Sequence, residues 1–245
     1  MAAPSGADAP PPVPLTVRPR AAVFDVNETL SDTAALRARL HALGAPAERL
    51  HARFLPSVLR DGFARTFAGE PVPFRRVAQD VLRADLGARG VREHLDRDLE
   101  EAVEFALGAF SEFTVHPDVP AGVRRLRAAG VELTAFTNGS GAQCEELLER
   151  AGVRAEFSHV LSVEVPGVWK PHPGAYAHAL SVGGRPAGEV LFVAVHPWDL
   201  DGAARAGFRT ALVEREGRPY PSASRTPDLS ATGVDALADL VLALP

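Results

Sequence analysis

The sequence predicts an α/β protein whose core is a Rossmann-like, doubly wound parallel sheet and which carries an inserted helical cap. Short apolar runs alternate with segments of helical periodicity along most of the chain, which is typical of βαβ units. The region after the first apolar run departs from this alternation, because residues 33–113 show helical spacing throughout. A chain of 245 residues, 46% of them hydrophobic, can bury both parts.

The predicted core strands are apolar runs of the length that crosses a buried parallel sheet. They are 21–26, 132–137, 190–195 and 210–213, with 158–163 as a weaker fifth. Each helix predicted between them ends before a glycine, the residue that a left-handed helix C-cap favours. These helices and glycines are 123–129 with Gly130, 143–151 with Gly152, and 202–206 with Gly207.

The predicted cap occupies residues 33–113, and the core consists of 20–32 and 114–245. The first cap helix follows Asp32, a suitable N-cap residue. It is indicated by three leucines at helical spacing, Leu36, Leu40 and Leu43. The other cap helices are predicted at 50–67, 74–86 and 99–110.

Composition excludes several classes of protein. Residues 1–19 are rich in Ala and Pro, lack the apolar run of a secretory signal, and are predicted to form a disordered tail. The 26 Lys and Arg residues are scattered along a chain of net charge -5, which argues against a nucleic-acid-binding surface. No apolar run approaches the roughly 18 residues of a membrane span. Because Cys144 is the only cysteine, no intrachain disulfide can form, and we expect a cytoplasmic protein without nucleic-acid or membrane partners.

Polar residues directly after the predicted strands form the candidate site, because ligands of open parallel sheets bind at the carboxyl ends of the strands. Asp25 ends the first strand. It could be a helix cap, or a carboxylate nucleophile that forms an ester or acyl phosphate. Lys170 is the only lysine in the chain. Beside Asp25, its ammonium group would keep that carboxylate ionised and neutralise charge that develops during attack.

Four motifs at these positions resemble those of the haloacid dehalogenase superfamily. They are Phe-Asp-Val-Asn-Glu-Thr-Leu at 24–30, Thr-Asn-Gly-Ser at 137–140, Val-Trp-Lys-Pro-His-Pro at 168–173 and Val-Ala-Val-His-Pro-Trp-Asp at 193–199. The resemblance implies that Asp25 is the nucleophile and that Thr137 and Asn138 hold the oxygens of the substrate. It also places Lys170 and Asp199 beside the nucleophile as catalytic residues.

Two departures separate the chain from the phosphatases of that superfamily. Those enzymes carry a general-acid Asp where this chain has Asn27, and a magnesium-binding Asp where it has Val195. Trp198 and Tyr176 instead resemble the L-2-haloacid dehalogenase branch. The resemblance therefore implies a hydrolase without metal or other cofactor. In it, Asp25 displaces halide from small (S)-2-haloalkanoic acids, and water hydrolyses the resulting enzyme ester.

Substrate recognition departs most from this branch. Leu55 aligns with an arginine that grips the halide, Asn27 with a tyrosine of the halide pocket, and His196 with an asparagine. With Trp198 and Tyr176, these are the predicted substrate-binding residues. His196 could bind the substrate carboxylate, activate water or have a structural role. The expected partner is a small carboxylate, and a homodimer is compatible with the resemblance. A phosphatase acting on a small phosphorylated metabolite and a catalytically silent binding protein remain alternatives.

Overall fold

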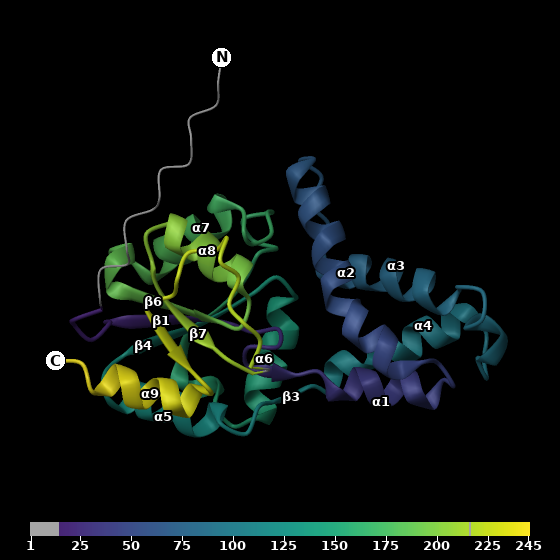
Figure 1. The fold of residues 1–245 in the computed structure, drawn as a ribbon, viewed down its shortest axis with the longest axis horizontal. Coiled ribbons are helices and arrows are strands. Elements are labelled where there is room, and N and C mark those ends of the chain that lie inside the picture. The colour runs from purple at the N-terminus through teal and green to yellow at the C-terminus, as the bar shows by residue number, and fades with distance from the viewer. Residues whose placement is uncertain (1–14, 216) are drawn as a thin grey trace, which may run out of the picture.

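The computed structural model describes residues 15–215 and 217–245. Its larger part is a sheet covered by helices, and a helical arm made of α1 to α4 extends from one side of it (Figure 1). The arm is inserted between β1 and the rest of the core, as the loss of strand periodicity after the first apolar run predicts.

Six parallel strands form the core sheet, in the order β5-β4-β1-β6-β7-β8. Their bounds are β1 Ala21–Asp25, β4 Glu132–Thr137, β5 Phe157–Ser162, β6 Val190–Ala194, β7 Arg209–Val213 and β8 Leu229–Ala231. All five predicted strands are confirmed, whereas β8 was not predicted because three residues give too little pattern. β1 lies between β4 and β6, so Asp25 emerges where the strand order reverses, the usual ligand position in such sheets.

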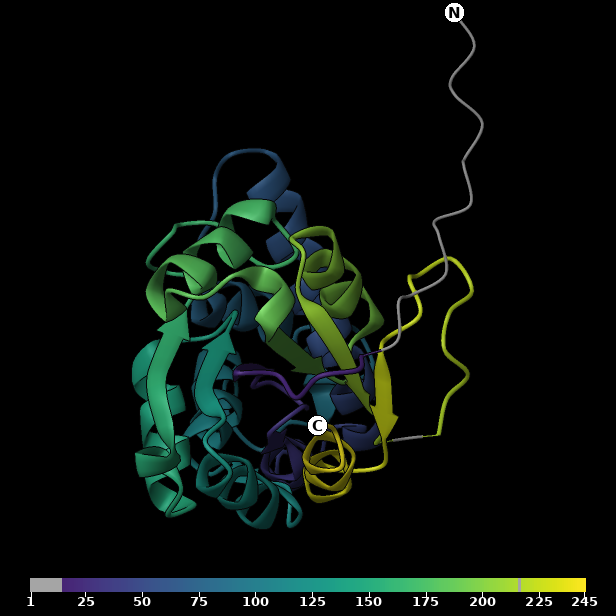
Figure 2. The same cartoon turned by 90° about the vertical axis from the view of Figure 1, so that its left-hand side faces the viewer.

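Helices cover both faces of this sheet (Figure 2). One face carries α5 Val119–Ala128, α6 Gly141–Arg150 and α9 Val234–Leu242, and the other carries α7 Pro173–Gly183 and α8 Pro197–Arg205. Successive side chains of β1 alternate between the two cores, with Val23 on the side of α7 and α8 and Phe24 on the opposite side. The predicted C-cap glycines are confirmed by their positive φ angles of 83°, 64° and 93° at Gly130, Gly152 and Gly207.

The arm consists of α1 Ala34–Ala42, α2 Ala47–Phe67, α3 Phe74–Leu86 and α4 Leu99–Leu107, at the positions of the predicted cap helices. The chain enters it through β2 (Ser31–Asp32) and leaves it through β3 (Thr114–Val115), and these two short strands pair antiparallel. The leucines that indicated the first helix, Leu36, Leu40 and Leu43, are all buried in the interior of the arm. The ribbon of β2 and β3 fixes the position at which the arm joins the core.

Trp169, in the loop after β5, joins the arm to the core a second time. Its ring stacks on that of Phe74 with centroids 5.6 Å apart, and its Nε1 donates a hydrogen bond to the carbonyl oxygen of Val72 at 3.0 Å. The ring also lies over Gly62 of α2, so closely that an added Cβ there would be 2.2 Å from it. The arm therefore packs directly against the neighbour of Lys170, over the carboxyl edge of the sheet.

Arg18 belongs to the predicted tail, yet its side chain contacts the core. The Arg18 guanidinium donates hydrogen bonds to the carbonyl oxygens of Leu242 and Leu244 at 2.9 and 3.1 Å, which ties this segment to the end of α9. Most of the predicted disordered tail, residues 1–14, lies outside the described residues. None of the helices that the structure describes has the length and apolar character of a membrane span.

Candidate active site

Lys170 lies between two carboxylates at the carboxyl edge of the sheet. Its Nζ donates to Asp25 Oδ1 at 2.8 Å, to Asp199 Oδ2 at 2.7 Å and to the carbonyl oxygen of Phe136 at 3.1 Å. Asp25 ends β1, Lys170 follows β5, and Asp199 lies in the first turn of α8 after β6. The three catalytic residues predicted from separate motifs are thus brought together by the convergence of parallel strands.

Burial sets the electrostatics of this cluster, because Lys170 and Asp199 are completely shielded from solvent and Asp25 is 3% exposed. Burial alone would raise the pKa of Asp25, but the charge of Lys170 and a hydrogen bond with His196 hold that pKa well below its usual range. Burial opposes the charge on Lys170, yet Asp199 and Asp25 together raise its pKa. Asp25 is therefore an ionised carboxylate beside a fixed ammonium group, as a nucleophile requires.

A gain in folding stability does not explain why these three charged groups are buried together. Removing two carboxylates and an ammonium group from water costs several kcal/mol for each ion, and their attraction only offsets this cost. Burial, together with the charge of Asp25, raises the pKa of Asp199 against the opposing effect of Lys170. Strongly perturbed groups gathered at a ligand-binding edge of a sheet mark a functional site.

The predicted oxygen-holding residues have separate tasks. Thr137 lines a cavity, and its Oγ1 accepts a hydrogen bond from the N–H of Gly139 at 2.8 Å. Asn138 is buried and binds the backbone of Lys170 twice: its Oδ1 accepts from the N–H at 2.9 Å, and its Nδ2 donates to the carbonyl oxygen at 3.2 Å. Asn138 thereby positions the lysine instead of lining the cavity.

Tyr176 is not placed where the sequence predicted it. It lies on the buried face of α7, completely shielded from solvent, between the rings of Phe192 and Phe208. Its hydroxyl donates to Asp199 Oδ1 at 2.6 Å. Burial and the charge of Asp199 raise its pKa, so it remains a donor. In this structure Tyr176 orients Asp199 from behind and does not line either cavity described below.

Two residues of the first motif belong to the site and were missed: Thr29 contacts the nucleophile, and Glu28 contacts His196. Thr29 is buried, donates to Asp25 Oδ2 at 2.7 Å and accepts from the N–H of Val195 at 3.1 Å. Glu28 has a left-handed backbone with φ of 61°. The sequence offered one signal for Thr29, a hydroxyl side chain four residues after the nucleophile within the same motif.

His196 occupies the other side of the nucleophile. Its Nδ1 lies 3.3 Å from Asp25 Oδ2, and its Nε2 lies 3.1 Å from Glu28 Oε2. Burial opposes protonation, but the hydrogen bonds with Asp25 and Glu28 outweigh it and raise the pKa of His196 to about 9. His196 is therefore an imidazolium at neutral pH, in direct contact with the nucleophile.

Trp198 was predicted to bind substrate, and the structure gives it another position. Its indole stacks on His196 with centroids 5.3 Å apart and meets Phe63 of α2 at 4.9 Å. It is absent from the linings of the two cavities beside Asp25 in the described chain. Trp198 packs between core and arm because the first turn of α8 faces α2.

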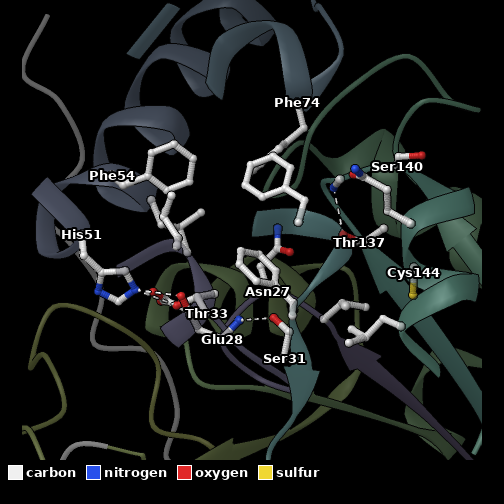
Figure 3. A pocket seen from close by; sticks show the side chains of 18 residues that line it. Asn27, Glu28, Ser31, Thr33, His51, Phe54, Phe74, Thr137, Ser140 and Cys144 are labelled. Atoms are coloured by element: carbon white, nitrogen blue, oxygen red, sulfur yellow. Dashed lines mark hydrogen bonds between the residues drawn. The ribbon is translucent and has the colours of Figure 1, made fainter. Parts of the chain in front are cut away.

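Two hollows adjoin the site. The smaller, about 60 Å³, is mainly apolar and contains Asn27 and Thr137 in its wall (Figure 3). Leu55 also lines it. Its aromatic wall consists of Phe54, Phe74, Phe110 and Phe113. Among the described residues that line it, none is an arginine, and Leu55 stands where the sequence comparison placed one. Arg60, also on α2, does not line this cavity, because its side chain is 71% exposed and paired with Asp61.

The larger hollow is a cleft of about 540 Å³ between core and arm, and its wall contains charged and polar side chains beside apolar ones. His196 and Val195 line it from the core, together with Arg215, His116 and Tyr220. The two hollows share four residues, namely Glu28, Ser31, Thr33 and His51. His196 contributes only to the larger one.

The donor set does not fit a magnesium ion. Among residues 15–215 and 217–245, no group of three or more His, Cys, Asp or Glu side chains is arranged to hold a metal. The ammonium group of Lys170 occupies the position between Asp25 and Asp199 that a bridging cation would need. Val195 offers only its backbone, and its N–H is bonded to Thr29.

The sequence model of the haloacid dehalogenase-like hydrolase family matches residues 19–207 of this chain. The chain belongs to this family. Its curated relatives include the (S)-2-haloacid dehalogenase of Pseudomonas sp. (strain YL), 28% identical over 219 residues that cover 89% of this chain and 92% of the relative. The haloacetate dehalogenase H-2 of Moraxella sp. (strain B) is 33% identical over 125 residues, 51% of this chain and 56% of that protein.

Solved structures agree with this assignment. The L-2-haloacid dehalogenase from Xanthobacter autotrophicus superposes with a TM-score of 0.82 at 25% identity, covering 92% of this chain and 99% of that chain. A second structure of that enzyme, with chloropropionic acid covalently bound, gives the same values. The family, the parallel sheet and the hydrolase class are thus confirmed for this chain.

Proposed function

We propose that this haloacid dehalogenase-like hydrolase releases halide from small (S)-2-haloalkanoic acids, with Asp25 as its covalent nucleophile. The observation that carries the proposal is Lys170 Nζ, held 2.8 Å from Asp25 Oδ1 and 2.7 Å from Asp199 Oδ2. This arrangement keeps Asp25 ionised, its neighbours Val26 and Asn27 line the smaller cavity, and a relative covering most of the chain is named (S)-2-haloacid dehalogenase. The proposed substrate is a small carboxylate. We also propose that the enzyme is cytoplasmic, and a homodimer is compatible with this proposal.

In the first step, a carboxylate oxygen of Asp25 attacks C2 of the substrate. The new C–O bond forms as the carbon–halogen bond breaks, and the halide leaves with the electron pair. No proton moves in this step, so Asn27 suffices where a phosphatase needs an acid. Lys170 neutralises the remaining carboxylate oxygen, and Thr29 holds Oδ2 in place.

In the second step, water attacks the carboxyl carbon of the Asp25 ester. The resulting oxyanion is stabilised by the ammonium group of Lys170, which Asn138 and Asp199 hold in position. Collapse breaks the bond between that carbon and the ester oxygen, releases a 2-hydroxy acid and restores the carboxylate. One oxygen of water therefore remains on Asp25 after each turnover.

Recognition is expected to favour apolar substituents. The cavity beside Asn27 and Leu55 is walled by four phenylalanines, which suit an alkyl chain or a large polarisable halogen. With Leu55 at this position, the leaving halide lacks a charge-assisted donor, typically worth about 1.5–3 kcal/mol. We therefore expect slow turnover of ordinary 2-chloro acids.

The experiment combines halide release with isotope labelling. Purified protein is incubated with fluoro, chloro and bromo acids, and with a phosphate ester panel plus Mg²⁺. A single turnover in ¹⁸O-water should place label on the Asp25 carboxylate in peptide mass spectra. Asp25→Asn should lose nearly all turnover, because an amide is a poor nucleophile. Label in the product alone would refute the covalent route, and Mg²⁺-dependent phosphate release would favour a phosphatase.

A further inference from the structure

We infer that His196, held by Glu28, is the base that hydrolyses the Asp25 ester, and that its water arrives through the larger cleft instead of the smaller apolar cavity. The inference rests on the proposed ester chemistry and assigns the second half of it. Four observations support it. Both carboxylate oxygens of Asp199 already accept hydrogen bonds, and His196 contacts both Asp25 and Glu28. The backbone of Glu28 is left-handed, and His196 lines only the larger of the two hollows.

Asp199 is poorly placed to activate water. It is completely shielded from solvent, its Oδ2 accepts from Lys170 at 2.7 Å, and its Oδ1 accepts from Tyr176 at 2.6 Å. A water bound there would need room that the packed side chains do not leave. The raised pKa of Lys170 also excludes it as a neutral base, because it stays an ammonium group. The hydrolytic step therefore needs another proton acceptor.

His196 meets the geometric requirement. Its Nδ1 is 3.3 Å from Asp25 Oδ2, within reach of a water that attacks the adjoining carboxyl carbon. Its Nε2 contacts Glu28 Oε2 at 3.1 Å, and a carboxylate accepts only from a protonated nitrogen. Neutral His196 thus carries its proton on Nε2 and directs the Nδ1 lone pair toward Asp25, as a base oriented by a carboxylate does.

Glu28 is held in this position at a cost. A non-glycine residue with φ of 61° is strained by about 1 kcal/mol or more, and such strain gathers at functional sites. Two contacts maintain it: the Glu28 N–H donates to Ser31 Oγ at 3.1 Å, and His116 Nε2 lies 3.1 Å from the Glu28 carbonyl oxygen. The strained turn directs the carboxylate at His196.

Water reaches His196 without crossing the substrate cavity. The side chain of His196 is 14% exposed and lines the cleft of about 540 Å³, which has room for many waters at roughly 10–15 Å³ each. The apolar cavity of about 60 Å³ lies on the other side of Glu28 and Ser31. Substrate and water then approach Asp25 from different hollows.

The proton balance is closed. In the resting enzyme His196 is an imidazolium paired with Asp25 and Glu28. Ester formation removes the negative charge of Asp25, so the pKa of His196 falls and its Nδ1 proton leaves to solvent. Neutral His196 then takes one proton from the attacking water and returns it to the departing alkoxide oxygen. Asp25 emerges as a carboxylic acid, ionises to His196, and the net products are the 2-hydroxy acid, halide and one proton.

Several charged and titratable groups face His196, and they set the pH at which it becomes a base. Asp25 of β1 and Glu28 contact it directly, Lys170 lies beside Asp25, and Asp32, His51, His116, Glu214, Arg215 and Arg218 line the same cleft. Removal of the negative charge on Asp25 is the only change in this set that the first chemical step causes. Protonation of His196 is therefore linked to the covalent state of the enzyme.

The test separates capture from hydrolysis by rapid mixing with a 2-bromo acid. Halide release in the first turnover reports ester formation, and intact-protein mass reports the ester itself. In His196→Asn, which keeps a hydrogen-bond donor but no base, we expect the halide burst to persist within about tenfold. Hydrolysis of the ester should fall by about 10²–10³-fold, so that the ester accumulates. Glu28→Gln should show a smaller accumulation of the same ester.

Imidazole rescue and a matched histidine control complete the design. Imidazole should restore hydrolysis in His196→Ala through the open cleft, which a merely structural role would not allow. His159→Asn, on β5 and paired with Glu132, should change neither rate. Equal hydrolysis in His196→Asn and the unchanged protein, without accumulated ester, would overturn the inference while the proposed function stands. A lack of halide and ester with the unchanged protein would overturn both.

Discussion

The charge of His196 predicts a specific loss of stability at high pH. Contacts with Asp25 and Glu28 raise its pKa to about 9, from an ordinary value near 6.5. A group whose pKa is raised by folding stabilises the protein fully below the ordinary value, and this stabilisation is lost as pH rises through the folded value. At 1.36 kcal/mol per pH unit, the rise corresponds to about 3 kcal/mol, lost between about pH 6.5 and 9.

The assay is urea unfolding of the unchanged protein and of His196→Asn at several values between pH 6 and 10. We expect the difference in free energy of unfolding between the two proteins to shrink by about 3 kcal/mol across this range. His116 is present in both proteins, so its contribution to the pH dependence cancels in this difference. Burial and the charge of Arg215 lower the pKa of His116, which therefore makes the free energy of unfolding rise with pH below pH 6.5. A difference that is independent of pH would refute the imidazolium assignment.

The remaining predictions concern packing, charge and recognition. Lys170→Met removes the ammonium group between two buried carboxylates, of which Asp25 keeps its contact with His196, and should cost about 3–5 kcal/mol in urea unfolding at pH 7; an unchanged midpoint would contradict this. Leu55→Arg should raise chloride release from 2-chloropropionate about ten- to a hundredfold, unless the unchanged protein already turns it over briskly. Gly62→Ala should destabilise by about 1–3 kcal/mol against Trp169, whereas Gly183→Ala, in open space on α7, should stabilise by up to about 1 kcal/mol in the same assay.

The sheet and the charged cluster could be predicted because they depend on chain direction alone. Buried parallel strands appear as short apolar runs, and their carboxyl ends necessarily meet at one edge. Asp25 ends such a strand, and Lys170 and Asp199 lie in the segments that follow two others, so their convergence at one edge required no knowledge of side-chain torsions. The switch between strand and helix periodicity indicated where the helices of the arm lie in the sequence.

The roles that the sequence did not predict depend on side-chain direction and local torsions. Tyr176 lies six residues after Lys170, but the rotation of α7 determines that its hydroxyl meets Asp199 instead of a cavity. Asn138 binds backbone groups, for which a side-chain motif gives no signal. The contact of Glu28 with His196 requires a positive φ, which sequence patterns rarely indicate outside glycine.

The two oxygens of Asp25 divide the chemistry between two sides of the site. Oδ1 is paired with Lys170, and Oδ2 is held by Thr29 and His196. Because Lys170 and His196 keep the pKa of Asp25 well below its usual range, the nucleophile is ionised across the whole practical pH range. Ester formation should therefore vary little with pH, whereas ester hydrolysis must follow the titration of His196 in the esterified enzyme. The pH dependence of steady-state turnover then identifies the rate-limiting half-reaction: a flat profile indicates capture by Asp25, and a profile that rises with pH indicates hydrolysis through His196.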